Sequence, residues 1–397
     1  MPETLLGDLN PPSRVLLGAG PSNVNPRVLR AMINPLLGYL DPDFIRIMDD
    51  VSGMLQQVFG ATGGFTLPVS GTGSAGMEAG LANVLEPGDV AVVVSHGYFG
   101  ERLAEIARRH GATVAVVPGE WGKTISLEAV EAELAQHSRV KVLATVHAET
   151  STGVLQPLED LARLAHQRDA LFLVDAVTSL GGTKVEVDST GIDVCYSATQ
   201  KCIGAPPGLS PVHINKRALD AIEQRTEPPR SWYLDLGLLR KYWEGGTRVY
   251  HHTAPMTMVY ALREALRLVL EEGLEKRYER HRLNGRALRA GLEAMGLKLL
   301  VPEAQCTYQL TSLLIPEGVD DGAMRTRLLH EYNIEIGGGL GRFQGSAWRI
   351  GLMGESSTAS NVLFVLSAME NLLPQLGFEV AVGSGVSEAS RVFAGVD

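Results

Sequence analysis

Two neighbouring segments decide the fold: LFLVDAVTSLGG at residues 171–182 and GIDVCYSATQKCIGAPPGLSP at residues 191–211. Each contains a short apolar run with β character, LFLV in the first and IDVCY in the second. Short runs of this kind, bounded by Gly and polar residues, are typical of buried strands. Asp175 ends the first run and Lys201 follows the second. Functional groups of open α/β sheets lie at the carboxyl ends of strands, so both side chains are expected at one site.

A carboxylate and a lysine that each follow a strand of one sheet suggest pyridoxal 5′-phosphate (PLP) chemistry. The lysine amine forms a Schiff base with the cofactor aldehyde. The carboxylate pairs with the pyridinium nitrogen, which lets the ring accept electrons. The alternative is a surface lysine and an aspartate that caps a helix. The segment around Lys201, QKCIGAPPG, is too apolar and too rigid in its prolines for an ordinary exposed loop, which favours the site.

The composition predicts an ordinary globular protein, because 45% of the 397 residues are hydrophobic and 20% are charged. No apolar run approaches the ~18 residues of a membrane span, and no secretory signal is visible at the N-terminus. We therefore expect a cytoplasmic protein without a membrane partner. The formal net charge of −10 argues against a nucleic-acid partner. Three cysteines without a C-x-x-C pair argue against a disulfide framework, and ten histidines without an H-E-x-x-H motif leave a metal site unsupported.

Strand-like and helix-like stretches alternate along the first half of the chain. Strands are expected at residues 65–70, 90–94, 113–117, 140–146 and 171–174, and helices at 43–57, 76–84, 101–109, 127–135 and 158–165. Such alternation predicts an α/β fold with a mostly parallel central sheet flanked by helices.

Changes in composition and hydrophobic periodicity along the sequence also predict a domain organisation. We expect an N-terminal arm at residues 1–17, a large α/β domain at 18–257 and a smaller α+β C-terminal domain at 258–383. Two long amphipathic helical stretches, at 258–272 and 274–295, would open the small domain. Residues 384–397 are small, polar and poorly periodic, and are expected to form a mobile tail.

Residues 71–76, GTGSAG, fit the pattern G-x-G-x-x-G between a strand and a helix. A dinucleotide-binding site would also need an acid at the end of the second strand, and the strand at 90–94 does not end in one. A glycine turn at a helix N-terminus still binds a single phosphate, with Thr72 and Ser74 as hydroxyl donors. A tight turn without a ligand is the alternative, and the carboxylate–lysine pair makes it less favoured.

Four further positions carry candidate chemistry. Thr150, in HAETSTG, is placed to hydrogen-bond the ring hydroxyl, with Glu149 fixing the loop, although such residues also make turns. Phe99 could stack on the ring or belong to the core. Arg349, in WRIG, is the candidate for a substrate carboxylate, which guanidinium binds bidentately. An exposed position would make it an ordinary surface arginine. The run YHHT at 250–253 taken alone resembles a helix entry.

Taken together, the motifs resemble the alanine–glyoxylate and serine–pyruvate aminotransferases, in the class V branch of fold-type I PLP enzymes. The motifs are GTGSAGME, HAETSTGVLQPL, DAVTSLGG, QKCIGAPPGL, SWYLDL, YHHTAP, IEIGGGLG and WRIGLMG. The similarity extends from Gly18 to about Leu373. It implies a PLP transferase that is a homodimer with active sites at the subunit interface. Ser74 stands where several members carry histidine, and Ala19 where proline is common.

The resemblance assigns roles residue by residue. Lys201 would be the Schiff-base lysine and Asp175 the partner of the pyridine nitrogen, so both are expected to be catalytic. The residues implied to bind the cofactor or its phosphate are Gly71, Thr72, Gly73, Ser74, Phe99, Thr150, Val177 and Gln200. Arg349 and Gly20 are implied to bind substrate. Tyr250 and Thr253 would reach the phosphate of the cofactor held by the other subunit.

The leading hypothesis is a ping-pong transamination from alanine or serine to glyoxylate, or to pyruvate. The long C-terminal segment is also similar to that of ureidoglycine–glyoxylate aminotransferases, which would imply ureidoglycine as donor and a role in purine catabolism. A PLP lyase or cysteine desulfurase is a further alternative, but Cys306, the only cysteine near the small domain, has no Gly/Ser-rich loop around it. A dinucleotide-binding or purely structural α/β protein is the alternative from another class.

Overall fold

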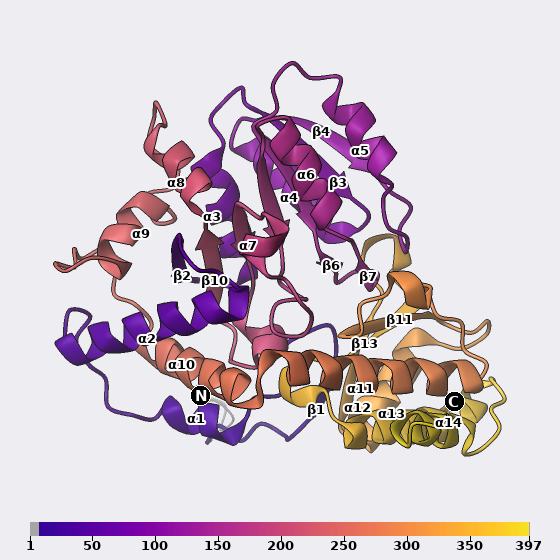
Figure 1. Ribbon diagram of the computed structural model, residues 1–397. Helices are drawn as coiled ribbons and strands as arrows, with labels where there is room; N and C mark the ends of the chain where they lie inside the picture. The colour runs from indigo at the N-terminus through magenta and orange to yellow at the C-terminus, as the bar shows by residue number, and fades with distance from the viewer. Residues whose placement is uncertain (1–7, 397) are drawn as a thin grey trace, which may run out of the picture.

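A seven-stranded sheet lies at the centre of the larger domain in the computed structural model, which describes residues 8–396 (Figure 1). Its strands run in the order β2 (Phe65–Ser70), β10 (Leu209–Ile214), β9 (Val194–Tyr196), β8 (Leu171–Asp175), β5 (Val142–Val146), β3 (Val90–Ser95) and β4 (Thr113–Pro118). β10 is antiparallel to both of its neighbours, whereas the other pairs are parallel. The predicted mostly parallel sheet is therefore confirmed.

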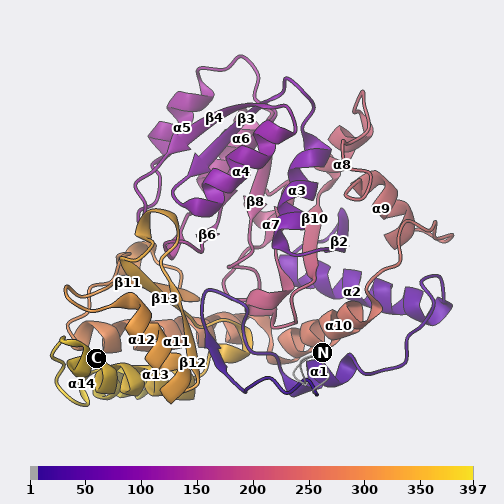
Figure 2. The ribbon, with the colours of Figure 1, turned by 180° about the vertical axis from the view of Figure 1, so that it is seen from behind.

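Helices cover both faces of this sheet, since α6 lies in front of it in Figure 1 and α4 lies in front of it in Figure 2. The helices of the larger domain are α1 (Pro26–Ala31), α2 (Pro42–Phe59), α3 (Gly73–Val84), α4 (Tyr98–Arg109), α5 (Leu127–Leu134), α6 (Glu159–Gln167), α7 (Val187–Thr190), α8 (Lys216–Glu223), α9 (Leu236–Trp243) and α10 (Met256–Glu272). A small hairpin, β6 (Ala148–Glu149) and β7 (Val154–Leu155), follows β5. Because helices cover both faces, a strand such as β5 is buried along its whole length, and its residues are apolar except for Thr145.

The smaller domain is built on a second sheet with the order β1 (Val15–Leu17), β12 (Ile334–Gly338), β13 (Ala347–Gly351) and β11 (Leu310–Leu314). Its helices are α11 (Leu274–Ala294), α12 (Asp321–Glu331), α13 (Ala359–Leu372) and α14 (Ser384–Phe393). This domain has an apolar core of its own, in which Trp348 and Leu366 are fully buried. The predicted α+β character of the C-terminal part is therefore present.

The domain boundaries differ from the prediction at two places. β1 was expected in the N-terminal arm, but it pairs in parallel with β12 through Val15 and Ile334. The first seven residues of that arm lie outside the described residues. α10 was expected to open the small domain, but it packs on α2 and α1, and its Val259 and Leu266 belong to the core of the large domain. An amphipathic pattern shows that a helix has a buried face, but not which core that face contacts.

The segment from residue 384, which was expected to form a mobile tail, contains helix α14, which packs on α11. The approach is close, because a Cβ atom on Gly291 of α11 would lie 2.8 Å from the carbonyl oxygen of Gly385. The Glu370 carboxylate of α13 accepts hydrogen bonds from the backbone N–H of Gly383 (3.0 Å) and Gly385 (2.6 Å) at the start of α14. This cap comes from another helix, so the local sequence could not reveal it.

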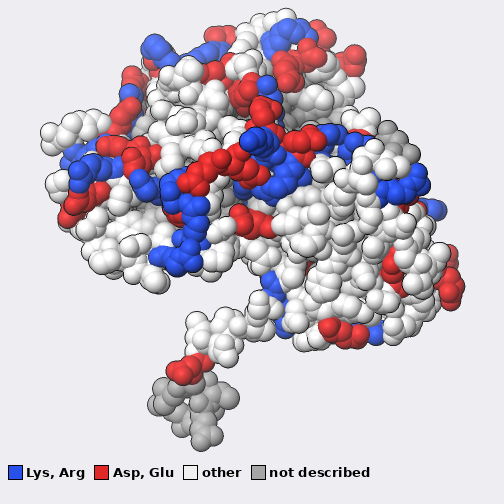
Figure 3. All heavy atoms as spheres, turned by 60° about the horizontal axis from the view of Figure 1, so that its bottom comes forward, with Lys and Arg blue, Asp and Glu red and all other residues white. Residues whose placement is uncertain are grey.

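Ion pairs hold α1 against α10 on the underside of the molecule. Arg27 donates to Glu264 (2.8 Å) and Glu271 (3.0 Å). Figure 3 looks onto the side that lies at the bottom of Figure 1, and it shows basic and acidic side chains next to one another there. Partly exposed pairs of this kind contribute little to stability. Among residues 8–396, no helix has both the length and the apolar character needed to cross a bilayer.

Candidate active site

A cavity of about 350 Å³ lies at the carboxyl ends of the parallel strands, where the two domains meet. It brings together most of the residues that the sequence singled out. The predicted residues in its wall are Gly20, Thr72, Gly73, Ser74, Phe99, Thr150, Asp175, Val177, Gln200, Lys201 and Arg349. The wall also contains Ala19, Pro21, Met77, Arg102, Val146, Pro207 and Leu340. Gly71, Tyr250 and Thr253 are the predicted residues that do not line it.

Lys201 lies in a short π-helical turn, η2 (Thr199–Ile203), directly after β9. Its backbone leaves the helical region there, with φ −100° and ψ −126°. Ser22 supports this conformation by donating its backbone N–H to the Gln200 carbonyl (2.9 Å) and its hydroxyl to the Lys201 carbonyl (3.0 Å). The Lys201 amine donates to the Ala19 carbonyl. Burial lowers the pKa of Lys201 to about 8, which raises its neutral, nucleophilic fraction near neutral pH.

Asp175 is the last residue of β8, and its carboxylate is buried at the cavity wall. It accepts hydrogen bonds from the Val177 backbone N–H (2.8 Å) and from the Tyr196 hydroxyl (2.8 Å). Burial raises the pKa of Asp175 to about 6, and both hydrogen bonds oppose that shift. No cation among the described residues hydrogen-bonds this carboxylate. A protonated ring nitrogen would therefore be a fitting partner for it.

Tyr196 was not recognised as a site residue from the sequence, where it only ends an apolar run. The structure aligns Asp175 and Tyr196 across the parallel pair β8–β9. This register places the hydroxyl against the carboxylate. A tyrosine at the end of the strand next to an acid was the only local signal, and it depended on knowing that the two strands are neighbours.

The glycine turn predicted to hold a phosphate lies at the N-terminus of α3, where Thr72 is the N-cap residue. Gly73 is closely packed, since a Cβ there would lie 3.0 Å from the Ala198 Cβ and 3.2 Å from a Val177 methyl group, so a larger residue would require these neighbours to move. Gly71 shapes the turn from outside the cavity: its N–H donates to the Gly208 carbonyl (2.9 Å), and its φ of +148° favours glycine. The free N–H groups of a helix N-terminus suit a phosphate.

Two polar side chains complete this end of the cavity. Gln200 lines the cavity, and its side-chain N–H2 group is the part that can donate to a phosphate, whereas its side-chain oxygen is buried without a hydrogen-bond partner among the described residues. The Ser74 hydroxyl accepts a hydrogen bond from Arg102 (3.2 Å). The Arg102 guanidinium also lies 4.9 Å from the centre of the Phe99 ring. Arg102 was missed in the sequence because it follows Phe99 on an ordinary amphipathic helix.

The loop after β5 is held by the Glu149 carboxylate, as the sequence predicted. Glu149 accepts hydrogen bonds from the Ser151 hydroxyl (2.6 Å) and from the Phe99 backbone N–H (3.3 Å). It therefore fixes both this loop and the first turn of α4. The Thr150 hydroxyl lies 2.5 Å from that of Thr178, so the two share a hydrogen bond at the cavity wall. Thr178, in the loop after Asp175, had not been singled out.

Arg349 extends from β13 of the small domain into the cavity wall. Its guanidinium donates to the Gly338 carbonyl (2.8 Å) and the Thr150 carbonyl (3.0 Å). It has no carboxylate partner among residues 8–396, and burial lowers its pKa. A partly buried guanidinium that contacts only neutral carbonyls is well suited to take up a carboxylate from a substrate. The alternative of an exposed arginine is excluded.

The segment YHHT lies away from the cavity of its own chain. Tyr250 is 52% exposed, and its ring centre lies 4.7 Å from that of Tyr39. His251 and His252 are buried, and their Nδ1 atoms lie 2.9 Å apart. His252 Nε2 also lies 2.7 Å from the Ser70 hydroxyl. The histidines anchor the segment, while Tyr250 remains available to a neighbouring molecule.

None of the three cysteines, all of which the structure describes, lines the cavity. Cys202 is buried, and its thiol donates to the Thr178 carbonyl (3.3 Å). Cys306 is also buried, and burial raises its pKa. A desulfurase would need an accessible, reactive thiolate. The geometry therefore disfavours that alternative.

Comparison with known proteins agrees with this site. Residues 15–347 match the family model "Aminotransferase class-V". An alanine–glyoxylate aminotransferase of Mus musculus is 42% identical over 94% of this chain and 90% of its own length. The crystal structure of an alanine–glyoxylate aminotransferase from Nostoc sp. is 47% identical, with a TM-score of 0.91 over 93% of this chain and 97% of that one. The structure of a ureidoglycine–glyoxylate aminotransferase from Bacillus subtilis is 42% identical, with a TM-score of 0.95 over 98% of this chain and 100% of that one.

The fold and the site thus define a fold-type I, PLP-dependent enzyme. This chain belongs to the class V aminotransferase family, and it is a transaminase whose cofactor is PLP. The residues described above fit that cofactor. Lys201 would hold it, Asp175 would face the ring nitrogen, and the N-terminus of α3 with Gln200 would bind the phosphate.

Proposed function

We propose that this aminotransferase transfers the amino group of a small L-amino acid, alanine or serine, to glyoxylate, which becomes glycine. The size of the cavity carries the proposal, because about 350 Å³ must hold both the cofactor and the substrate. Close to Lys201 the wall is made of Ala19 and Gly20, and a Cβ on Gly20 would lie 2.7 Å from the Lys201 side chain. Arg349 provides an anchor for the substrate carboxylate, and the small residues near Lys201 leave little room for a side chain. These two features suit a substrate with a very short side chain.

The chain's own residues divide the work of such a transfer. When bound, PLP supplies an aldehyde that takes up the amino group and a ring that accepts the electron pair from the substrate α-carbon. Arg349 holds the substrate carboxylate and orients the α-carbon toward Lys201. The Lys201 amine accepts the α-proton, which its lowered pKa of about 8 allows near neutral pH. Asp175 keeps a negative charge beside the ring nitrogen.

A second candidate donor is ureidoglycine. It is favoured by the Bacillus subtilis structure, whose similarity extends over 98% of this chain and so includes most of the C-terminal segment. Glycine formation from glyoxylate distinguishes the two proposals when alanine, serine and (S)-ureidoglycine are compared as donors. We expect kcat/KM for alanine or serine to exceed that for ureidoglycine. The reverse order would support the second candidate, and no glycine from any of the three would contradict both.

Replacing Arg349 with alanine is expected to raise KM for both the donor and glyoxylate by about 10- to 100-fold, because a charge-assisted hydrogen bond to a carboxylate is lost. Steady-state kinetics with each substrate varied in turn would measure the effect. Arg342→Ala is the matched control, since Arg342 lies on the same domain, is 68% exposed and pairs with Glu101 instead. An unchanged KM in Arg349→Ala would remove Arg349 from the substrate site.

We also propose that the enzyme acts as a homodimer in which Tyr250 and Thr253 complete the phosphate site of the partner. Tyr250 and Thr253 lie outside their own cavity, and large apolar side chains are exposed close by. These include Ile33 (83% exposed) and Leu36 (68%) in the chain segment that leads to Tyr39, the ring neighbour of Tyr250. A second copy of this chain would cover such a surface.

Mixing two inactive variants tests the shared site. In a hybrid of a Lys201→Ala chain and a Tyr250→Ala chain, one of the two sites would contain both an intact Lys201 and an intact Tyr250. Activity should therefore return, up to about half of the wild-type value per dimer, after the two variants are mixed and allowed to exchange. Hybrids that stay as inactive as their parents, or a monomeric mass in solution, would contradict the shared site.

A further inference from the structure

Arg277 occupies a position that is unfavourable for a cation. It lies in the first turn of α11, where the helix dipole is positive, and its side chain is only 2% exposed. Burial lowers its pKa, as does the neighbouring Arg280. A buried charge persists only where specific partners compensate it. The partners of Arg277 therefore indicate why it is there.

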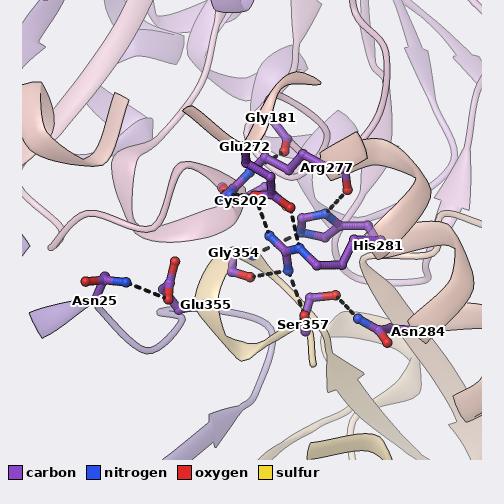
Figure 4. A network of polar contacts seen from close by, with 11 residues as sticks. Asn25, Gly181, Cys202, Glu272, Arg277, His281, Asn284, Gly354, Glu355 and Ser357 are labelled. Carbon is purple, nitrogen blue, oxygen red and sulfur yellow. Dashed lines mark hydrogen bonds and ion pairs between the residues drawn. The ribbon is translucent and has the colours of Figure 1, made fainter. Parts of the chain in front are cut away.

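Two of these partners are carbonyl groups close in sequence to the catalytic residues, and the third is a carboxylate of α10 (Figure 4). The guanidinium donates to the Cys202 carbonyl (2.6 Å), one residue after Lys201. It also donates to the Gly181 carbonyl (3.1 Å), in the loop that follows Asp175. A third hydrogen bond reaches the Glu272 carboxylate (2.5 Å) at the end of α10. One side chain of the small domain thus joins the turn after β9 to the loop after β8.

The backbone at Lys201 needs such support, because it is not helical within its turn. Consecutive carbonyls of this turn are held by groups from elsewhere in the chain. Ser22 binds those of Gln200 and Lys201, and Arg277 binds that of Cys202. The planar guanidinium can contact two carbonyls and a carboxylate at once, which a lysine cannot reproduce.

The contacts continue from Arg277 to the segment that follows Arg349. The Glu272 carboxylate also accepts a hydrogen bond from Arg280 (2.6 Å), which donates to the carbonyls of Gly354 (2.9 Å) and Ser357 (2.6 Å). His281 completes the connection. Its Nδ1 lies 2.7 Å from the Arg277 carbonyl, and its Nε2 accepts the Gly354 N–H (3.1 Å), so the ring is neutral with its proton on Nδ1.

We propose that Arg277 is a positioning residue for Lys201. It fixes the turn from which the lysine enters the cavity, and through Glu272 and Arg280 it holds that turn in register with β13, which carries Arg349. The base and the carboxylate anchor of the substrate are thereby kept at a set separation. The proposal concerns Lys201 itself, so it holds for any amino donor.

Arg277→Lys and Arg277→Met, measured as holoenzymes, test this role. A misplaced catalytic group slows the reaction steeply, so we expect kcat to fall by about 10- to 100-fold in Arg277→Lys, with KM changed by less than about twofold. The visible absorption of the bound cofactor, titrated with pH, should show a shifted midpoint, because it reports the state of Lys201. Arg277→Met should show the larger change in both readouts.

Arg282→Met is the matched control, because Arg282 lies on the same helix, is 45% exposed and pairs with Glu279. It should keep the wild-type kcat and midpoint. Arg277→Lys retains a positive charge beside Glu272 and should therefore fold. It tests the positioning role even if Arg277→Met does not fold. A folded Arg277→Lys with the wild-type kcat and midpoint would overturn the proposal. An equal loss of kcat in Arg282→Met would also overturn it.

Discussion

Replacing Lys201 with alanine should abolish amino-group transfer, lowering kcat by about 10⁴-fold or more, since both the attachment of the cofactor and the proton transfer depend on this amine. Lys201 is the only lysine in the cavity wall among the described residues. The phosphate contacts at the N-terminus of α3 do not involve its side chain. The variant should therefore still bind PLP, but without a covalent link. Steady-state glycine formation and the cofactor content after denaturation would measure the two effects.

Lys184→Ala is the control for this experiment. Lys184 is 60% exposed and pairs with Glu186 (2.9 Å) on the surface, so its removal should leave kcat unchanged. Turnover by Lys201→Ala within tenfold of the wild type would exclude Lys201 as the catalytic base. Retention of a covalent cofactor by that variant would place the attachment elsewhere.

Asp175→Asn is expected to have the second largest effect, a loss of about 10²- to 10³-fold in kcat/KM. Asparagine has nearly the same shape, but it cannot carry the negative charge that faces the ring nitrogen. The pH dependence of stability should change as well. In the cofactor-free protein, burial raises the pKa of Asp175 from 3.8 to about 6. Asp175 therefore makes its full contribution to the stability of the folded state below about pH 4, where it is protonated, and this contribution is lost as the pH rises to about 6. The Asn variant should lack that dependence, which thermal unfolding at several pH values would show.

Tyr196→Phe is the matched smaller change at the same carboxylate. The Tyr196 hydroxyl lowers the pKa of Asp175, so its removal should raise that pKa further. The acid limb of kcat/KM should then move to higher pH by about one unit, the worth of one hydrogen bond to a charged group. A full rate in Asp175→Asn, or an acid limb that moves to lower pH in Tyr196→Phe, would contradict the role assigned to Asp175.

The sequence was most informative where structure is locally determined. The strands between Phe65 and Tyr196 could be predicted because they are apolar runs between polar turns. The rule that ligands bind at the carboxyl ends of strands then placed Asp175 and Lys201 in one cavity. The glycine turn and Arg349 could also be predicted as site residues. Glycines between a strand and a helix, and an arginine within an apolar strand, have few other structural roles.

What the sequence did not reveal depends on contacts between distant segments. Tyr196 reaches Asp175 only through the β8–β9 register, and Arg277 meets the Lys201 turn only after α11 has packed against the large domain. The pairing of β1 with β12 and the capping of α14 by Glu370 are of the same kind. Each of these contacts depends on the tertiary fold, which local periodicity does not predict.

The most direct test of the central claim is the absorption spectrum of the purified holoenzyme through one half-reaction and then the other. L-Alanine or L-serine is added first, the free amino acid is removed, and glyoxylate follows. We expect the visible band of the bound cofactor to be bleached by the donor and restored by glyoxylate, with release of glycine. A protein that takes up no PLP, or a yellow protein whose spectrum neither amino acid changes, would contradict an alanine- or serine-dependent transaminase built on Lys201.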